Sequence, residues 1–462
     1  MQHGSSTWHR GLLVPKGRYQ DSGRFTRKFA HLRSLKSFTL KDAEQLGASG
    51  GIMEDTLGPN GDNPTIPAGF TFFGQFVDHD ITFDPTSHLE QQNDPQAIQN
   101  FRTPMLELDS VYGSGPGASP WLYDRKKSGH FLIDSGAPHD VPRNGQQQAL
   151  IGDPRNDENV IVSQIHLMFL KYHNVIMDNF ASSFEEAQTL VRWHYQWIVL
   201  NEYLRLICGD EAVDAALARP STCPCTKEFA MPVEFAVAAF RFGHSQVRAG
   251  YALNANFGAA LFPADPLAPD PDFETEPDPN DPPPGDLRGG FRLHPAMEVD
   301  MFRFFGPNAQ LSRMIDTKLV APLLALPDTV IPGLPATHPD RSLATRNLKR
   351  SISFGLPSGE AIAAYYGIPA LTPAEIGNIP GGGDGTPLFF YILKEAEIHG
   401  KGERLAGVGA RIVAETFVDM LKMDYASFLA SAPDWKPTLP ATQGAGTYGM
   451  VDVARLAVRW KP

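Results

Sequence analysis

The fold class is decided by the stretch IVSQIHLMF at residues 161–169. Its large apolar side chains recur three or four positions apart, so they lie along one face of an α-helix. These side chains are Ile161, Ile165, Met168 and Phe169. The same spacing returns between Glu185 and Ile207, which predicts helix almost throughout residues 159–208.

Outside this segment the sequence predicts more helices and few strands. The sequence indicates a short helical core around Phe72–Asp80, a helix at Pro232–Ala249 with Pro232 near its start, and two more helices at Pro387–Glu397 and Gly407–Leu429. No internal repeat is visible. We therefore expect a mainly α protein, built as a single large helical domain with very little β-structure.

The division of the chain follows from composition rather than from length. Its 462 residues alone would suggest two or three domains of roughly 150 residues each. Residues 1–60 are irregular and basic at first, so we expect an N-terminal wrapping arm and one large domain over residues 61–462. The stretch Pro263–Gly290 contains nine prolines and eight acidic residues without apolar periodicity, which predicts an exposed loop.

Composition also excludes several classes of protein. Hydrophobic residues make up 42% of the chain, which suffices for a large core, and the net charge of −12 disfavours nucleic acid as a partner. No apolar run approaches the roughly 20 residues that a membrane span needs. The N-terminus lacks the apolar segment of a signal peptide. We expect a soluble protein, either cytoplasmic or exported by a route that uses no such signal.

The three cysteines do not form a disulfide framework. The spacing Cys223-Pro-Cys225 is too tight for a zinc knuckle, and the histidine of a covalent haem-attachment motif does not follow it. We expect free thiols at Cys208, Cys223 and Cys225, with a labile disulfide as the alternative.

Four short segments carry the chemistry. The first is Gly74-Gln75-Phe76-Val77-Asp78-His79-Asp80, in which a histidine between two carboxylates stands in an apolar stretch. In a helix these three side chains point in different directions, and carboxylates buried without partners would be costly. A solvated turn is the structural alternative.

The second segment is Gly152-Asp153-Pro154-Arg155-Asn156-Asp157-Glu158, at the start of the long helical stretch. Arg155 and Glu158 are three residues apart and can share a face. A helix-capping cluster would explain the same residues, because Asp and Asn suit a helix start.

The third segment is Phe240-Arg241-Phe242-Gly243-His244. Gly243 costs about 1 kcal/mol in a helix interior relative to alanine, so something should approach the backbone closely there. The two alternatives are a bound group, such as the face of a haem, and a tight helix crossing.

The fourth segment is Thr103-Pro104-Met105-Leu106-Glu107-Leu108-Asp109-Ser110-Val111-Tyr112-Gly113. Thr103, Glu107 and Asp109 offer oxygen ligands of the kind that calcium prefers, although the spacing is not that of an EF-hand.

Together and in their order along the chain, the segments resemble the animal haem peroxidase family, and Asn347-Leu348-Lys349-Arg350-Ser351 adds a fifth match. The similarity runs from about Thr71 to Leu429, and the chain is most similar to the shorter bacterial members. It implies a haem-dependent peroxidase that reduces hydrogen peroxide.

The resemblance implies a role for each matching residue on the peroxide side of a haem. His79 would be the general base, Arg155 would stabilise the charge that develops as the O–O bond breaks, and Gln75 would face small anions and water. Asp78 and Glu158 match carboxylates that form ester bonds to haem methyl groups.

On the other side of the haem, the resemblance makes His244 the axial ligand of the iron. Asn347 would accept a hydrogen bond from the other ring nitrogen of His244 and set its tautomer. Arg241 matches the arginine that precedes this histidine by one turn.

The resemblance also implies a calcium ion. Its ligands would be Asp80, Thr103, Glu107 and Asp109, with the carbonyl of Met105. Since Asp80 adjoins His79, the ion would clamp the base in position.

One departure from the family pattern limits the implied chemistry. Asn159 follows Glu158 where myeloperoxidase has a methionine bonded to the haem, which disfavours chloride oxidation. Bromide, iodide, thiocyanate or aromatic donors are the expected targets. A cyclooxygenase-like fatty-acid dioxygenase of the same superfamily is a rival, but those enzymes have a radical-forming tyrosine at the position of Arg241, so this residue favours a peroxidase. A haem- or calcium-binding adhesion protein without turnover is a second rival.

Overall fold

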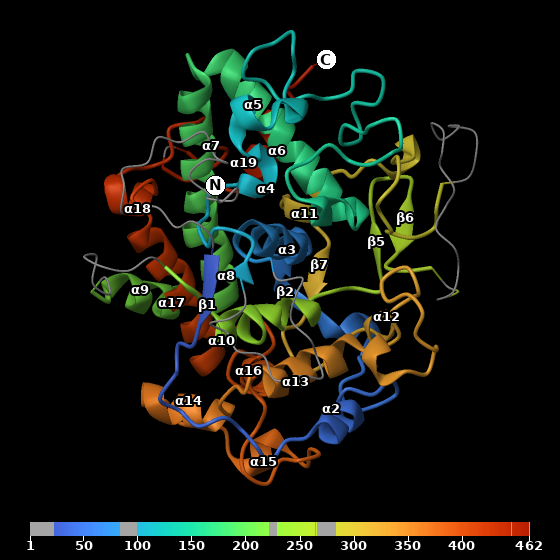
Figure 1. Cartoon of the computed structure of the whole chain (residues 1–462), viewed down its shortest axis with the longest axis vertical. Coiled ribbons are helices and arrows are strands. Elements are labelled where there is room, and N and C mark those ends of the chain that lie inside the picture. The colour runs from blue at the N-terminus through green and yellow to red at the C-terminus, as the bar shows by residue number, and fades with distance from the viewer. Residues whose placement is uncertain are drawn as a thin grey trace, which may run out of the picture.

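Helices dominate the computed structural model, which describes residues 23–83, 99–220, 229–263, 265, 283–444 and 446–461 (Figure 1). The longer helices are α2 (Leu40–Leu46), α3 (Gly69–Ile81), α6 (Val160–Asn179), α7 (Phe184–Ile198), α8 (Leu204–Cys208), α9 (Asp210–Ala218), α13 (Leu343–Ser353), α14 (Gly359–Tyr366), α16 (Leu388–Ile398), α17 (Gly407–Met423) and α19 (Met450–Ala457). The expectation of a mainly α protein is confirmed.

Short helices and strands fill the space between these elements. The one-turn helices are α4 (Asp109–Tyr112), α5 (Gly115–Ala118), α10 (Val233–Ala236), α11 (Phe302–Phe305), α12 (Ala321–Leu324), α15 (Pro373–Ile376) and α18 (Phe428–Ser431). The 3₁₀-helices are η1 (Gly58–Gly61), η2 (Pro120–Leu122), η3 (Pro154–Asp157), η5 (Ala239–His244), η6 (Pro295–Met297) and η7 (Pro339–Arg341).

The strands are short and form three small sheets. They are β1 (Gly23–Thr26), β2 (Asp62–Pro67), β3 (Gln99–Asn100), β4 (Met231–Pro232), β5 (Gly250–Ala252), β6 (Gly258–Ala260) and β7 (Leu311–Arg313). The sheet orders are β3-β1-β4, β2-β7 and β5-β6. β1 pairs in parallel with β4, whereas the other pairs are antiparallel.

Helix α3 lies near the middle of the molecule (Figure 1). It is apolar on nearly all sides, as a helix inside a large core must be, and Phe73 and Phe76 are fully buried. Phe76 stacks on Phe169 of α6 at a centroid distance of 5.0 Å. A side chain at Gly74 would collide with the hydroxyl group of Tyr203, so glycine here permits the close approach of another segment.

The predicted helical stretch 159–208 is confirmed, with one turn between α6 and α7. Asn159 caps α6 by accepting a hydrogen bond from Val162 N, and Ser183 caps α7 in the same way. A π-helical segment, η4 (Val199–Tyr203), joins α7 to α8 without a break. The predictions of helices at Phe72–Asp80 and Pro387–Glu397 are confirmed by α3 and α16.

Two predicted helices are wrong in extent. In place of one long helix, the segment Pro232–Ala249 contains the one-turn helix α10 and the 3₁₀-helix η5. Residues 233–240 are buried throughout, so tertiary contacts rather than an amphipathic face set their path. The helix from Gly407 ends at Met423, where Asp424 adopts an extended conformation, and α18 follows separately.

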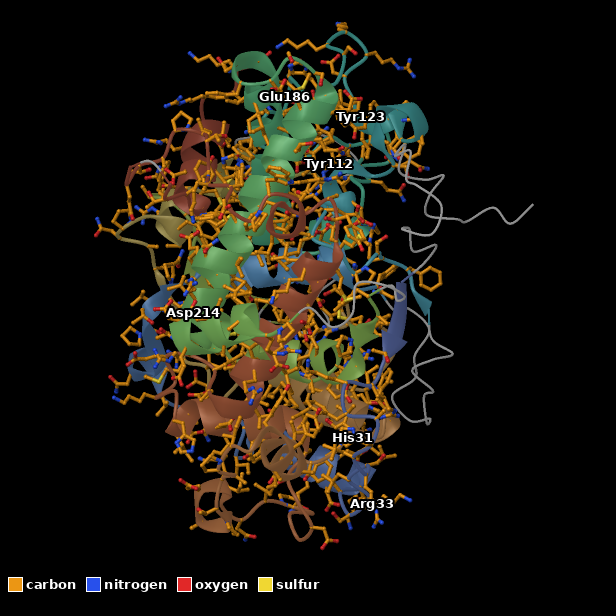
Figure 2. The ribbon with its side chains drawn as sticks, turned by 90° about the vertical axis from the view of Figure 1, so that its left-hand side faces the viewer. His31, Arg33, Tyr112, Tyr123, Glu186 and Asp214 are labelled. Carbon is orange, nitrogen blue, oxygen red and sulfur yellow. The ribbon has the colours of Figure 1, made fainter. Side chains whose placement is uncertain are left out.

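The described part of the N-terminal segment crosses several elements. Arg27 donates hydrogen bonds to the carbonyls of Phe354 and Gly355 after α13, and the backbone N–H of Lys28 donates to buried Glu234. Figure 2 shows His31 and Arg33 at the opposite end of the long axis from Tyr112 and Tyr123.

Several predictions fall partly outside the described residues. Residues 264 and 266–282 of the Pro263–Gly290 loop, together with Cys223 and Cys225, lie outside them. Cys208 is a buried free thiol. Among the described helices, none is both long enough and apolar enough to cross a membrane.

Candidate active site

A cavity of about 1060 Å³ is lined by residues of α3, η3, η5 and α13. Most of the site residues predicted from the sequence line this one cavity: Gln75, Asp78, His79, Arg155, Glu158, Arg241 and His244. They come from three segments that lie far apart in the sequence. The cavity is of the size that proteins use for cofactors and drug-sized ligands.

His79 on α3 is presented to this cavity as a neutral base. Its Nδ1 lies 2.8 Å from Oδ1 of Asn156, so Nδ1 carries the proton and donates it, which leaves a lone pair on Nε2. Nε2 lies 3.6 Å from the carboxylate of Glu158. Burial lowers the pKa of His79 below its usual value, and the nearby Glu158 only partly opposes this effect.

Arg155 of η3 is fixed beside His79 by several hydrogen bonds. Its guanidinium donates to the carbonyl oxygens of His79 (3.0 Å) and Thr82 (2.7 Å) and to the carboxylate of Asp153 (2.8 Å). Asp153 is fully buried, and its hydrogen bond with Arg155 holds its pKa well below its usual value against the effect of burial. A cation is therefore positioned next to the neutral base.

The carboxylates of Asp78 and Glu158 belong to the same cavity wall. Glu158 accepts a short hydrogen bond from Gln75, whose own oxygen accepts one from Asn159 at 3.2 Å. Asp78 accepts a hydrogen bond from the hydroxyl of Thr82 at 2.9 Å. Both carboxylates thus face the cavity within a polar network.

His244 ends the 3₁₀-helix η5 and also lines the cavity. Asn347 Nδ2 of α13 lies 2.8 Å from its Nδ1. The sequence predicted the opposite polarity, with Asn347 as acceptor, and a half-turn of the amide would present Oδ1 instead. Burial lowers the pKa of His244 to about 3, so its imidazole is neutral and can serve as a metal ligand.

The surroundings of Gly243 distinguish between a bound group and a tight helix crossing as the reason for a glycine at this position. A β-carbon there would meet no atom within 4 Å, so no helix crosses at this point. Instead, Gly243 lines the cavity. Its neighbour Arg241 donates a hydrogen bond to the carbonyl of Ala236 and lies 3.7 Å from Asp78 across the cavity wall.

The residues predicted to bind calcium are not among those that line the cavity. Asp80 is fully buried, and its Oδ2 accepts hydrogen bonds from Leu108 N and the hydroxyl of Tyr195. Burial and the nearby Asp109 raise the pKa of Asp80. Oδ1 of Asp80 and the hydroxyl of Thr103 are buried without a hydrogen-bond partner among the described residues.

The remaining predicted calcium ligands lie in the loop before α4 and at Asp109, the first residue of that helix. Glu107 and Asp109 are buried carboxylates, and Met105 accepts a hydrogen bond from Glu107 N at its carbonyl oxygen. Within the described ranges, no group of three or more His, Cys, Asp or Glu residues is placed to hold a metal by itself. A calcium ion would therefore depend on hydroxyl and carbonyl oxygens as well.

Sequence reasoning missed a role for Asn156. It was explained as part of a capping cluster, but its amide bridges His79 and His166, with Nδ2 lying 3.0 Å from His166 Nδ1. Arg102 was also missed, although it contacts both Asp109 and Asp153 and so connects the loop to the partner of Arg155. Neither contact leaves a signal in a single sequence, because each joins distant segments.

The cavity combines two kinds of chemistry. A neutral base beside a fixed guanidinium can move a proton and stabilise a developing negative charge. A buried neutral imidazole whose Nδ1 is engaged presents its Nε2 to a metal. A cofactor whose metal is bound by His244 would share the cavity with His79 and Arg155.

Comparison with known proteins gives a consistent result. Residues 88–260 match the family model described as animal haem peroxidase. Thyroid peroxidase of Rattus norvegicus is 26% identical over 181 residues, which make up 33% of this chain and 20% of that protein. A peroxidase-like protein of Margaritifera margaritifera is 32% identical over 113 residues, or 21% of this chain and 14% of that protein. The chain thus matches a fifth or less of the length of these relatives.

Solved structures share the fold over most of the chain. Peroxidase A from Dictyostelium discoideum superposes with a TM-score of 0.62 at 17% identity and covers 92% of both chains. A fatty acid alpha-dioxygenase of Arabidopsis thaliana gives a TM-score of 0.53 at 14% identity, covering 97% of this chain and 83% of that chain. At such identities the likeness shows a common fold.

Proposed function

We propose that the chain, of which residues 88–260 match the animal haem peroxidase family model, is a haem-dependent oxidoreductase that reduces hydrogen peroxide and oxidises small donors. One observation carries the proposal. A single cavity is lined by a neutral imidazole suited to iron, His244, and by the base and guanidinium of His79 and Arg155.

The cavity has room and charge for a haem. The open space beside Gly243 lets a flat group approach the backbone next to His244. Arg346 and Arg350 of α13 also line the cavity, and guanidinium groups suit the propionates of a haem. Bound haem would supply an iron centre that exchanges electrons with a peroxide.

The side chains handle the protons of this reaction. Nε2 of His79 takes a proton from one oxygen of hydrogen peroxide and delivers it to the other, which leaves as water. Arg155 stabilises the negative charge that develops on the leaving oxygen. Asn156 keeps the proton on Nδ1 of His79, so that Nε2 remains the basic atom.

The surroundings of Gln75 favour small anions and aromatic compounds as electron donors. Gln75 is held between Glu158 and Asn159, and Asn159 has no sulfur to bond to a haem. We propose bromide, iodide, thiocyanate or phenols rather than chloride as donors. Steady-state rates measured for each donor would rank them.

Asp78 and Glu158 are proposed to attach the haem by ester bonds. Both carboxylates line the cavity, where a haem methyl group could reach them. If they are esterified, acidified organic solvent will not extract the haem from denatured protein. Complete extraction would refute the attachment.

Calcium is proposed to bind Asp80, Thr103, Glu107, Asp109 and the carbonyl of Met105. The supporting observation is a buried carboxylate oxygen and a buried hydroxyl that lack hydrogen-bond partners within the described residues, on Asp80 and Thr103. Such groups are costly to bury unless something binds them. Since Asp80 follows His79 on α3, the ion would fix the position of the base.

Absorbance tests the proposed function against its rivals. Protein produced with haem should show a Soret band that changes rapidly when hydrogen peroxide is added. A haem spectrum that ignores peroxide would indicate a binding protein, and the lack of a Soret band would indicate a structural domain. Arg241 occupies the position of the tyrosine expected of a cyclooxygenase-like enzyme, so oxygen uptake with fatty acids is expected to be absent.

A further inference from the structure

Aromatic side chains form a continuous series from the cavity towards the surface. The series begins at Tyr203, which lines the cavity and whose ring lies 5.6 Å from that of Phe73. Phe73 is 6.1 Å from Tyr195, Tyr195 is 5.9 Å from Phe169, and Phe169 is 6.2 Å from Tyr172, all between ring centroids. These rings are buried, and they belong to α3, α6, α7 and η4.

The second half of the series leads outwards. The hydroxyl of Tyr448 donates a hydrogen bond of 3.0 Å to that of Tyr172. The ring of Tyr448 lies 4.6 Å from His194, and His194 lies 5.0 Å from Trp435. Trp435 in turn lies 5.4 Å from Trp193. Helices α6 and α7, which carry much of this series, lie side by side in Figure 1.

The series ends in a group of tryptophans that is partly exposed. Trp193 and Trp197 are four residues apart, so they share one face of α7, and Trp435 packs against both. All three are partly buried against the core rather than enclosed in it. We call Trp193, Trp197 and Trp435 the tryptophan cluster.

We propose that this series carries oxidising equivalents from the cavity to the tryptophan cluster, and that the cluster oxidises aromatic donors too large to enter the cavity. The proposal rests on the proposed peroxidase function, which supplies the oxidant. A bulky phenol gives one electron to an oxidised indole of the cluster and releases its proton to water. This electron restores the indole, which had earlier passed one of its own electrons inwards along the series. Two electrons delivered in this way, together with two protons, convert one molecule of hydrogen peroxide into two molecules of water.

The surroundings of the buried tyrosines suit this electron transfer. An oxidised tyrosine must release its phenolic proton, so it needs a proton acceptor nearby. The hydroxyl groups of Tyr172 and Tyr448 are hydrogen-bonded to each other and can exchange a proton. Phenylalanine would fill the same space without the cost of burying a hydroxyl, so packing alone does not account for these groups.

His194 is suited to stand between Tyr448 and Trp435 because it carries no charge. Its Nε2 accepts hydrogen bonds from the N–H groups of Thr438 and Leu439, and its Nδ1 lies 2.7 Å from the carbonyl of Leu190. Burial lowers the pKa of His194 to about 4. No positive imidazolium therefore opposes the passage of an electron hole at neutral pH.

A positive charge next to the tryptophan cluster makes one of its three indoles harder to oxidise than the other two. The ammonium group of Lys436 lies 4.9 Å from the ring of Trp197, where it disfavours an indole radical cation. Trp193 donates its indole N–H to the carbonyl of Ala426 and lies in contact with Trp435. We therefore assign the oxidised state to Trp193 and Trp435.

Radical trapping tests the proposal without relying on turnover. Haem-loaded protein is mixed with hydrogen peroxide and a nitroso spin trap, digested, and mapped by mass spectrometry. We expect adducts on Trp193 or Trp435 that disappear in Trp435→Phe and in Tyr448→Phe. Trp121→Phe, which alters an exposed tryptophan outside the series, is the matched control and should keep the adducts.

A second measurement separates this proposal from the proposed function. Oxidation of a phenol tethered to dextran should be lost in Trp435→Phe and Tyr448→Phe, whereas oxidation of iodide should be unchanged. If wild-type protein oxidises iodide but shows no adducts on the cluster, or if the adducts survive in Tyr448→Phe, the relay is refuted. If peroxide leaves the haem spectrum and iodide unchanged, the peroxidase function itself fails.

Discussion

The two histidines of the cavity are held in opposite ways. His79 stands on the regular, buried helix α3, where Arg155 and Glu158 surround it with charge. His244 ends the irregular helix η5 and is oriented by the neutral amide of Asn347. From this difference we propose that one wall of the cavity moves protons and stabilises charge, whereas the other orients a ligand.

The largest effect is expected from a substitution in the cavity wall that carries His244. Replacing His244 by alanine removes the proposed iron ligand, so we expect the haem to be lost or bound with an altered spectrum. Absorbance at the Soret band measures this effect, and His399→Ala, an exposed histidine, is the control. A wild-type spectrum in His244→Ala would contradict the assignment of the two walls.

The second-largest effect is expected from a substitution in the cavity wall that carries His79. In His79→Ala the haem should remain bound, but its reaction with hydrogen peroxide should slow by at least ~10²-fold, because a positioned acid–base group is lost. Stopped-flow absorbance gives the rate constant. An unchanged rate would show that another group moves the proton.

A matched pair of amide substitutions sharpens the comparison. Asn347→Leu and Asn156→Leu each remove the partner of a histidine Nδ1 while nearly preserving volume. We expect Asn347→Leu to weaken haem binding by ~10-fold or more, as for other partners of metal ligands, and Asn156→Leu to slow only the peroxide reaction. Equal effects of both variants on haem affinity would show that the walls do not differ in role.

The smallest effect is expected from removal of calcium. A chelator should lower the melting temperature, since an ion bound only to the folded state stabilises it. It should also slow the peroxide reaction through the neighbouring His79. Asp80→Asn should abolish the response to the chelator, and a melting temperature that never responds in wild-type protein would exclude the ion.

The segments that form the two walls also differ in how well the sequence predicted them. Helices α3, α6 and α7 were predictable because their apolar residues recur with a helical period over several turns. The path of Pro232–Ala249 was not, because residues 233–240 are buried throughout and tertiary contacts set their path. His79 and Arg155 stand out as unusual residues in apolar or Pro-containing segments.

Contacts between distant segments could not be predicted from composition or spacing. His244 and Asn347 are 103 residues apart, and their pairing followed only from the family resemblance. Asn156 was missed because a local explanation, helix capping, was sufficient for it. The aromatic series from Tyr203 to Trp435 likewise joins segments that no local pattern connects.

The most direct test of the account is a crystal structure of the protein loaded with haem. We predict that Nε2 of His244 is bonded to the iron and that His79 and Arg155 face the opposite side of the same porphyrin. A haem bound elsewhere, or one with both imidazoles on the same side, would contradict the account.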